Sequence, residues 1–168
     1  MNGESVTGSR VYRVGVHLLI VLGIAATILV AIGIVILVKS GEWKFLACVA
    51  GGTALFFLLV QILRLEIGPS SFRYRNLSGS REVIFADVGR AYFEVIETSK
   101  APQGVAVFYV DRRKGGRVKI NLRTFSVAAA ADLFTALESH GVQIEVPDQW
   151  AARRMADEIR AEQAKTRS

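Results

Sequence analysis

The feature that most constrains this chain is a nearly unbroken apolar stretch from Val16 to Leu63. Its first part, 16–38, holds 23 residues, of which only His17 and Thr27 are polar. A helix rises ~1.5 Å per residue, so this segment reaches about 34 Å and exceeds the ~30 Å hydrocarbon core of a bilayer. The pattern predicts a transmembrane helix over 16–38, preceded by a short N-terminal segment at 1–15.

A second apolar segment, 45–63, follows a short polar connector at 39–44. Its 19 residues include Thr53 and Gln61 as the polar members and are just enough to cross a bilayer. A connector this short makes the two helices antiparallel neighbours. We therefore expect a transmembrane helical hairpin with 39–44 as its external loop.

The main alternative for the first segment is a cleaved signal peptide. The apolar run is too long for the h-region of a signal, and the residues from Val38 to Gly41 do not form a small-residue cleavage site. A second apolar segment also follows at once. We expect the first segment to remain in the mature chain.

The balance of basic residues beside the two segments predicts their orientation. The connector holds two, Lys39 and Lys44. Six lie on the other side of the hairpin: Arg10, Arg13, Arg64, Arg73, Arg75 and Arg81. Because cytoplasmic flanks are enriched in Lys and Arg, both termini are expected in the cytoplasm. The chain is then a multi-pass protein of the inner (plasma) membrane.

The polar residues near the hairpin fit a membrane anchor better than a channel or a transporter. Four are expected at the membrane interface, where amphipathic and charged side chains reach the headgroups: Arg13, His17, Trp43 and Lys44. Neither apolar segment contains Asp, Glu, Lys or Arg, so the sequence offers no ion site and no proton relay.

Small residues recur every four positions in both segments. They are Gly23, Thr27 and Ala31 in the first and Ala47 and Gly51 in the second. Small residues at this spacing let helix backbones approach closely in lipid, which predicts that these faces pack the two helices together. The alternative, that Gly and Ala are simply common in spans, stays open.

The segment from 64 to 149 has the pattern of a small polar domain. Short alternating stretches between turn residues predict four to six mostly antiparallel strands. Ser126 is the expected N-cap of one amphipathic helix, which ends at Gly141. The predicted fold class is α+β: a helical hairpin followed by an antiparallel meander or roll closed by one helix. The tail, 150–168, is expected either to form a helix or to fray.

This order of elements resembles the pleckstrin-homology-like (PH-like) domain of bacterial membrane proteins. The resemblance is carried by two opening strands, an Asp followed by a β-branched residue, and a late strand that leads into the helix: Leu65–Ile67, Phe72–Arg75, Phe85–Val88 and Val118–Phe125. A pair of spans directly before the domain is common in that family. The resemblance implies a binding or scaffolding module.

Seven basic residues are candidates for contact with anionic lipid or with a partner: Arg73, Arg75, Arg112, Arg113, Lys114, Arg117 and Lys119. Most of them cluster in one turn, and a solvated hairpin tip is the alternative interpretation. The net charge of +6 fits an anionic membrane surface, since no aromatic-and-basic nucleic-acid module occurs.

Nothing in the sequence indicates catalysis, a metal site or a cofactor. His17 and His140 have no Cys, Asp or Glu at triad or ligand spacing, and Cys48 is the single cysteine. We expect a non-enzymatic scaffold at the cytoplasmic membrane surface. A sensor of anionic lipid and an accessory subunit of a larger membrane complex are the alternatives. The expected partners are the bilayer and a protein, which includes a second copy of this chain.

Overall fold

The structure, a computed structural model, describes residues 8–40, 43–98 and 101–167. Over these residues the chain has the predicted α+β class, with four helices and two four-stranded sheets. The helices are α1 (Val16–Ser40), α2 (Trp43–Gln61), α3 (Val127–Ser139) and α4 (Trp150–Arg167).

The first sheet is antiparallel throughout and has the order β1-β2-β3-β4. Its strands are β1 (Arg10–Arg13), β2 (Arg64–Ile67), β3 (Ser71–Asn76) and β4 (Gly79–Ile84). Alternation sets its faces: Phe72 and Tyr74 are buried, whereas Arg73 and Arg75 point outward.

The second sheet has the order β7-β6-β5-β8, in which only the pairing of β8 with β5 is parallel. Its strands are β5 (Val88–Thr98), β6 (Ala101–Arg112), β7 (Arg117–Ile120) and β8 (Ile144–Glu145). Two 3-10 turns, η1 (Phe85–Asp87) and η2 (Leu122–Thr124), connect β4 to β5 and β7 to α3.

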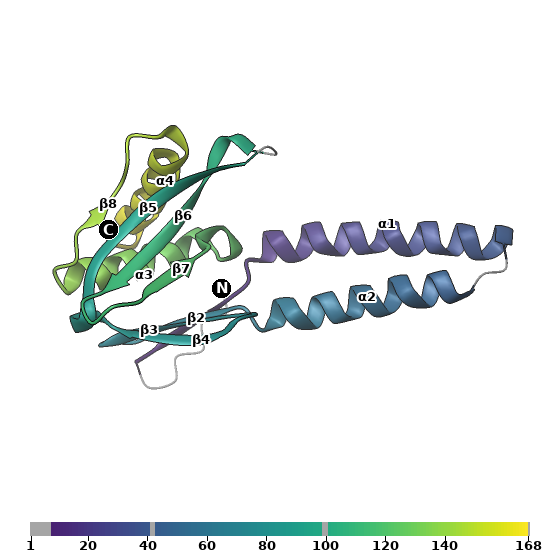
Figure 1. Ribbon diagram of the computed structural model, residues 1–168, viewed down its shortest axis with the longest axis horizontal. Helices are drawn as coiled ribbons and strands as arrows, with labels where there is room; N and C mark the ends of the chain where they lie inside the picture. Colours follow the sequence, from purple (N-terminus) through teal and green to yellow (C-terminus); the bar gives the residue numbers. More distant parts are fainter. Residues whose placement is uncertain (1–7, 41–42, 99–100, 168) are drawn as a thin grey trace.

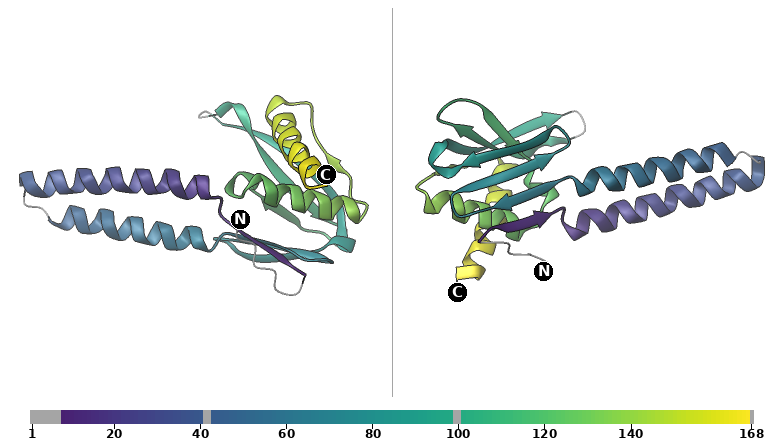
Figure 2. Two further views of the ribbon diagram at one scale, coloured as in Figure 1. Left: turned by 180° about the vertical axis from the view of Figure 1, so that it is seen from behind. Right: turned by 90° about the horizontal axis from the view of Figure 1, so that it is seen from below.

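Helices α3 and α4 close the core that the two sheets share (Figure 2). The ring of Phe134 on α3 lies 5.9 Å from that of Phe93 and 5.3 Å from that of Phe108, between the centroids. Ser126 caps α3 as predicted, with its hydroxyl accepting from the backbone N–H of Ala129.

The C-terminal tail is ordered. Helix α4 packs against α3 and β6, and its buried face includes Ala152, Ala156 and Ile159. The prediction of a single closing helix is therefore wrong: two helices close the domain. Alanines on both helices allow this contact, since Ala130 and Ala131 of α3 are buried as well.

The N-terminal segment also belongs to the domain. The sequence pattern predicts no strand within residues 1–15, but β1 pairs with β2 along its whole length, from Arg10 opposite Ile67 to Arg13 opposite Arg64. A strand of four residues gives little alternation to detect, and its partner lies some 50 residues further along the chain. The helical hairpin is thus inserted between two neighbouring strands of one sheet (Figure 1).

Helices α1 and α2 lie side by side and project from the domain as a long arm (Figures 1 and 2). The less exposed positions of each helix recur every three or four residues, as expected for the shared face of a helix pair. They include Leu22, Ala26, Val30 and Gly33 on α1 and Leu46, Val49, Thr53, Phe57 and Val60 on α2.

The small residues predicted to pack the two helices together do not form this shared face. Thr27, Ala31, Ala47 and Gly51 are exposed, and a Cβ added at Gly23 or Gly51 would meet no atom within 4 Å. The predicted packing role is wrong for these four exposed residues, because the shared face is formed by other positions, which include the small residues Ala26 and Gly33. The hydroxyl of Thr27 instead donates to the carbonyl of Gly23, within its own helix.

One described helix is long and apolar enough to cross a membrane, over Leu19–Lys39. Only 6% of its most apolar window is buried inside the protein. The described part of α2 contains a shorter apolar stretch, Leu46–Leu55. The predicted hairpin is therefore present as a pair of helices, while length and composition qualify only the first of them as a span.

Candidate functional site

The candidate site lies at the base of the hairpin, where three arginines are aligned across the first sheet. The register places Arg13 opposite Arg64, and Arg64 opposite Arg75. Residues directly opposite one another share a sheet face, so the three side chains lie on the outer face in one row that ends at Ser80 of β4. Arg13 and Arg75 are exposed, and Arg64 is half-buried.

This arginine row (Arg13, Arg64 and Arg75) borders both helices of the hairpin. Only two residues separate Arg13 from α1, and two separate α2 from Arg64. Like charges directly opposite each other destabilise a sheet. Among the described residues, no carboxylate lies within ion-pair distance of any of the three.

The next row along the same face pairs one arginine with two glutamates. Arg73 faces Glu66 on one side and Glu82 on the other, with N–O distances of 3.8 and 2.7 Å. Hydrogen bonds from Arg73, which has the larger effect, and from Ser71 lower the pKa of Glu82. Sequence analysis singled out Arg73 and Arg75 together, but the structure separates them: Arg73 belongs to an ion-pair network and Arg75 to the arginine row.

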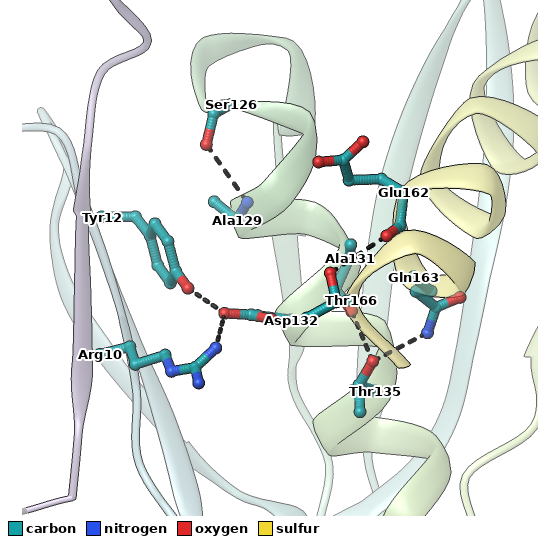
Figure 3. A network of polar contacts seen from close by, with 10 residues as sticks. All are labelled: Arg10, Tyr12, Ser126, Ala129, Ala131, Asp132, Thr135, Glu162, Gln163 and Thr166. Carbon is teal, nitrogen blue, oxygen red and sulfur yellow. Dashed lines mark hydrogen bonds and ion pairs between the residues drawn. The ribbon is translucent and has the colours of Figure 1, made fainter. Parts of the chain in front are cut away.

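A polar clasp joins β1 to α3 just below this row (Figure 3). Arg10 and Tyr12 both reach across to Asp132 of α3 and donate to the same carboxylate oxygen, Arg10 at 2.6 Å. Burial, followed by the hydrogen bond to Asp132, raises the pKa of Tyr12 to about 12. The clasp ties the strand that leads into α1 to the helix that closes the core.

A second contact secures the hairpin base. The backbone N–H of Gly15 donates to the carbonyl of Thr124 at 2.9 Å, which ties the start of α1 to η2. On the other side of α3, Gln163 of α4 donates to the hydroxyl of Thr135 at 3.0 Å (Figure 3). Helix α3 therefore connects β1, and through it the hairpin, to the C-terminal helix.

The basic turn between β6 and β7 lies at the opposite end of the domain (Figure 1). Strand β7 runs from this turn toward η2, which adjoins the hairpin base. A full strand length therefore separates the turn from the hairpin base, and the contact of its residues with lipid or a partner stays a prediction. The predicted residues concerned are Arg112, Arg113, Lys114, Arg117 and Lys119.

Most of that turn's arginines are used within the domain. Arg117 pairs with Asp111 at 2.8 Å, and Arg113 donates to the carbonyl of Val88 at 3.2 Å. The guanidinium of Arg112 folds over Gly116, whose φ of +89° suits glycine. Lys114 and Lys119 remain exposed.

Two clefts indent the domain. One, of about 430 Å³, lies near the basic turn, where His140 stacks on Phe85 with 4.6 Å between ring centroids. Arg90, Arg113 and Glu145 are the charged residues along it, and Arg90 pairs with Glu145 at 2.5 Å. The other, of about 400 Å³, lies between α4 and the start of α3, under the exposed ring of Trp150.

No described group of three or more His, Cys, Asp or Glu residues is placed to hold a metal ion. His140 lies at the end of α3, with Nδ1 2.8 Å from the carbonyl of Ala136 and 3.3 Å from the hydroxyl of Ser139. Cys48 is exposed on α2.

The predicted interface residues lie at both ends of the hairpin. Arg13 is at its base, and Trp43 and Lys44 are exposed at its far end. His17 belongs to α1, but its side chain is outside the described part of the structure.

Several site residues were not found from the sequence. Arg13 and Arg64 were noted only as flanking charge or interface residues, and Asp132 and Tyr12 were not noted at all. The signal that unites them is the pairing of β1 with β2, which joins residues some 50 positions apart.

No protein-family model, curated protein or solved structure matches this chain. The resemblance to PH-like domains stays a prediction from the sequence pattern, which none of these comparisons supports.

Removing the Tyr12 hydroxyl should weaken the clasp. We expect Tyr12→Phe to lower the free energy of unfolding by about 1 to 2 kcal/mol, because a half-buried hydrogen bond to a carboxylate is lost. Denaturant unfolding of the purified full-length protein in mild detergent measures this. Tyr92→Phe, on the second sheet, is the matched control and should change stability little. Equal stability of Tyr12→Phe and wild type would contradict the clasp.

The clasp also predicts a dependence on alkaline pH. The folded pKa of Tyr12, about 12, exceeds the ~10 of an unfolded tyrosine. The contribution of Tyr12 to stability is therefore fully present below pH 10 and is lost as the pH rises from 10 toward 12. Unfolding free energies measured over this range should fall more steeply for wild type than for Tyr12→Phe. Parallel curves would show that the phenol titrates normally.

Proposed function

We propose that this chain is a non-enzymatic interaction or scaffolding protein of the inner membrane. Its hairpin crosses the bilayer twice and holds the domain, for which a PH-like fold is our hypothesis, at the cytoplasmic surface. The observation that carries the proposal is the position of the hairpin between two hydrogen-bonded strands.

The exposed surface of α1 supports a membrane environment. Ile20, Ile24 and Ile28 are 53, 58 and 55% exposed. A core helix of a soluble protein would bury such residues against its own domain, but α1 projects away from it (Figure 1). An apolar surface of this size is stable only when lipid or another protein covers it.

The pairing of β1 with β2 supports two crossings rather than one. Paired strands lie on the same side of a membrane, so the chain between Arg13 and Arg64 crosses it an even number of times. If α1 spans, the chain must return before Arg64, and α2 is the element available for that return. The 19 residues of α2 rise about 28 Å, close to the thickness of the hydrocarbon core.

The same pairing argues against a cleaved signal sequence. Cleavage after α1 would remove β1, together with the contact of Tyr12 with Asp132. The fold would then lose an edge strand and a clasp to α3.

The ends of the hairpin fit the two interfaces of a bilayer. Trp43 and Lys44 lie at the far end, where an amphipathic ring and a snorkelling lysine suit the outer headgroup region. The basic residues Arg13 and Arg64 lie at the base, on the side expected to be cytoplasmic.

A second candidate function is that of an accessory subunit in a larger membrane complex. The observation that favours it is the outward position of the small residues Thr27, Ala31, Ala47 and Gly51. A smooth helix surface facing lipid allows the close approach of a helix from another chain.

Cysteine labelling tests the two crossings. In a Cys48→Ala background, we expect Lys39→Cys to react with an impermeant maleimide only in right-side-out vesicles. Lys119→Cys should react only in inside-out vesicles. The native Cys48, within the hairpin, is the control and should react poorly from both sides until detergent is added. Labelling of Lys39→Cys and Lys119→Cys from the same side would contradict the proposal.

A further inference from the structure

We propose that the arginine row, Arg13, Arg64 and Arg75, is a binding site for the phosphate of an anionic phospholipid headgroup. The inference rests on the proposed function, because it requires the base of the hairpin to lie at the membrane surface. It names a ligand that the proposed function leaves open and a site that differs from the predicted basic turn.

The charge of the arginine row is unbalanced, and the sheet fixes the spacing of its residues. Neighbouring strands lie ~4.8 Å apart, so three guanidinium groups share a row about 10 Å wide. The carboxylates of this face serve the adjacent row, where Glu66 and Glu82 both pair with Arg73. A phosphate offers the missing negative charge and accepts paired N–H donors from arginine.

The position of the arginine row also favours a lipid phosphate. The row is separated by only two residues from each hydrophobic helix, so it lies at the depth of the lipid phosphates when the hairpin spans. The polar clasp and the bond from Gly15 to Thr124 fix the sheet at the hairpin base. The row therefore cannot turn away without breaking contacts of the domain.

An exposed apolar turn beside the arginine row favours a lipid over a soluble anion. Beyond Arg75, strand β3 ends at Asn76, and the turn that follows presents Leu77 with 64% of its surface exposed. This turn lies on the hairpin side of the arginine row. An apolar tip beside a row of arginines matches the boundary between headgroups and acyl chains.

Native mass spectrometry of the full-length protein in mild detergent tests the site. The protein is titrated with equal amounts of phosphatidylglycerol and phosphatidylcholine, and the ratio of the two bound lipids is measured. Each basic residue near an anionic surface contributes about 1 kcal/mol, which corresponds to about fivefold in affinity. We expect wild type to prefer phosphatidylglycerol, and Arg13→Gln/Arg64→Gln/Arg75→Gln to lose at least about tenfold of that preference.

Two further variants separate a built site from diffuse attraction. Arg73 lies on the same strand and face as Arg75, but it is paired with glutamate. The lipid preference of Arg73→Gln should therefore stay within about twofold of that of wild type. Replacing the three row residues by lysine keeps the charge but loses paired donation, so the preference should fall between those of wild type and the glutamine variant. Loss on Arg73→Gln equal to that of the triple variant, or full retention in the lysine variant, would overturn the site.

Retention of the wild-type preference by the folded triple glutamine variant, or by Arg75→Gln together with Arg64→Gln, would overturn the proposal. Displacement of phosphatidylglycerol by millimolar inorganic phosphate would indicate a soluble-anion site and overturn the lipid assignment. Carbonate extraction of membranes that contain the wild-type protein tests the membrane anchor separately from the arginine row. Release of the wild-type protein would refute the membrane anchor, whereas retention without lipid preference refutes the arginine row alone.

Discussion

The pairing of β1 with β2 is the interaction on which the rest of the architecture depends. It joins the two ends of the hairpin to each other by backbone hydrogen bonds from Arg10 opposite Ile67 to Arg13 opposite Arg64. Because the connections to α1 and α2 are two residues each, the orientation of the hairpin follows from the orientation of the sheet. The clasp from Tyr12 to Asp132 then fixes that sheet to α3, and the bond from Gly15 to Thr124 fixes the first helix to η2.

The same pairing organises the charge of the outer sheet face. Of its two rows, one balances Arg73 with Glu66 and Glu82 and is a stabilising network within the domain. The other aligns Arg13, Arg64 and Arg75 without a described carboxylate, next to the hydrophobic helices. The glutamates of the first row pair with its arginine, whereas the second row is the one that we propose to bind an external anion.

Much of the fold followed from the sequence where the period of the pattern is strong. The alternation of Phe72 and Tyr74 with Arg73 and Arg75 predicted a strand with the correct faces, and Ser126 predicted the start of α3. The apolar run predicted a helix over the residues that form α1. These features are local, so neighbouring residues carry the whole signal.

The candidate site was predicted less well because it depends on contacts between distant segments. β1 has four residues and a partner across the hairpin, so alternation alone did not reveal it. Without β1, the alignment of Arg13 with Arg64 and the clasp to Asp132 had no signal. Spacing also misled in the hairpin, where Thr27 and Ala31 share an outward face while other positions on α1, Ala26 and Gly33 among them, face α2.

Disulfide cross-linking in native membranes is the most direct test of the pairing of β1 with β2 on either side of the hairpin. Val11 and Glu66 lie opposite each other, so Val11→Cys/Glu66→Cys in a Cys48→Ala background should form an intramolecular disulfide on mild oxidation. The pair Val11→Cys/Arg73→Cys, which lies in the same row but has β2 between its two strands, should not. Efficient cross-linking of the first pair in membrane-embedded protein is the predicted result. Failure to cross-link, with both cysteines reactive to maleimide from the cytoplasmic side, would contradict a hairpin inserted between paired strands.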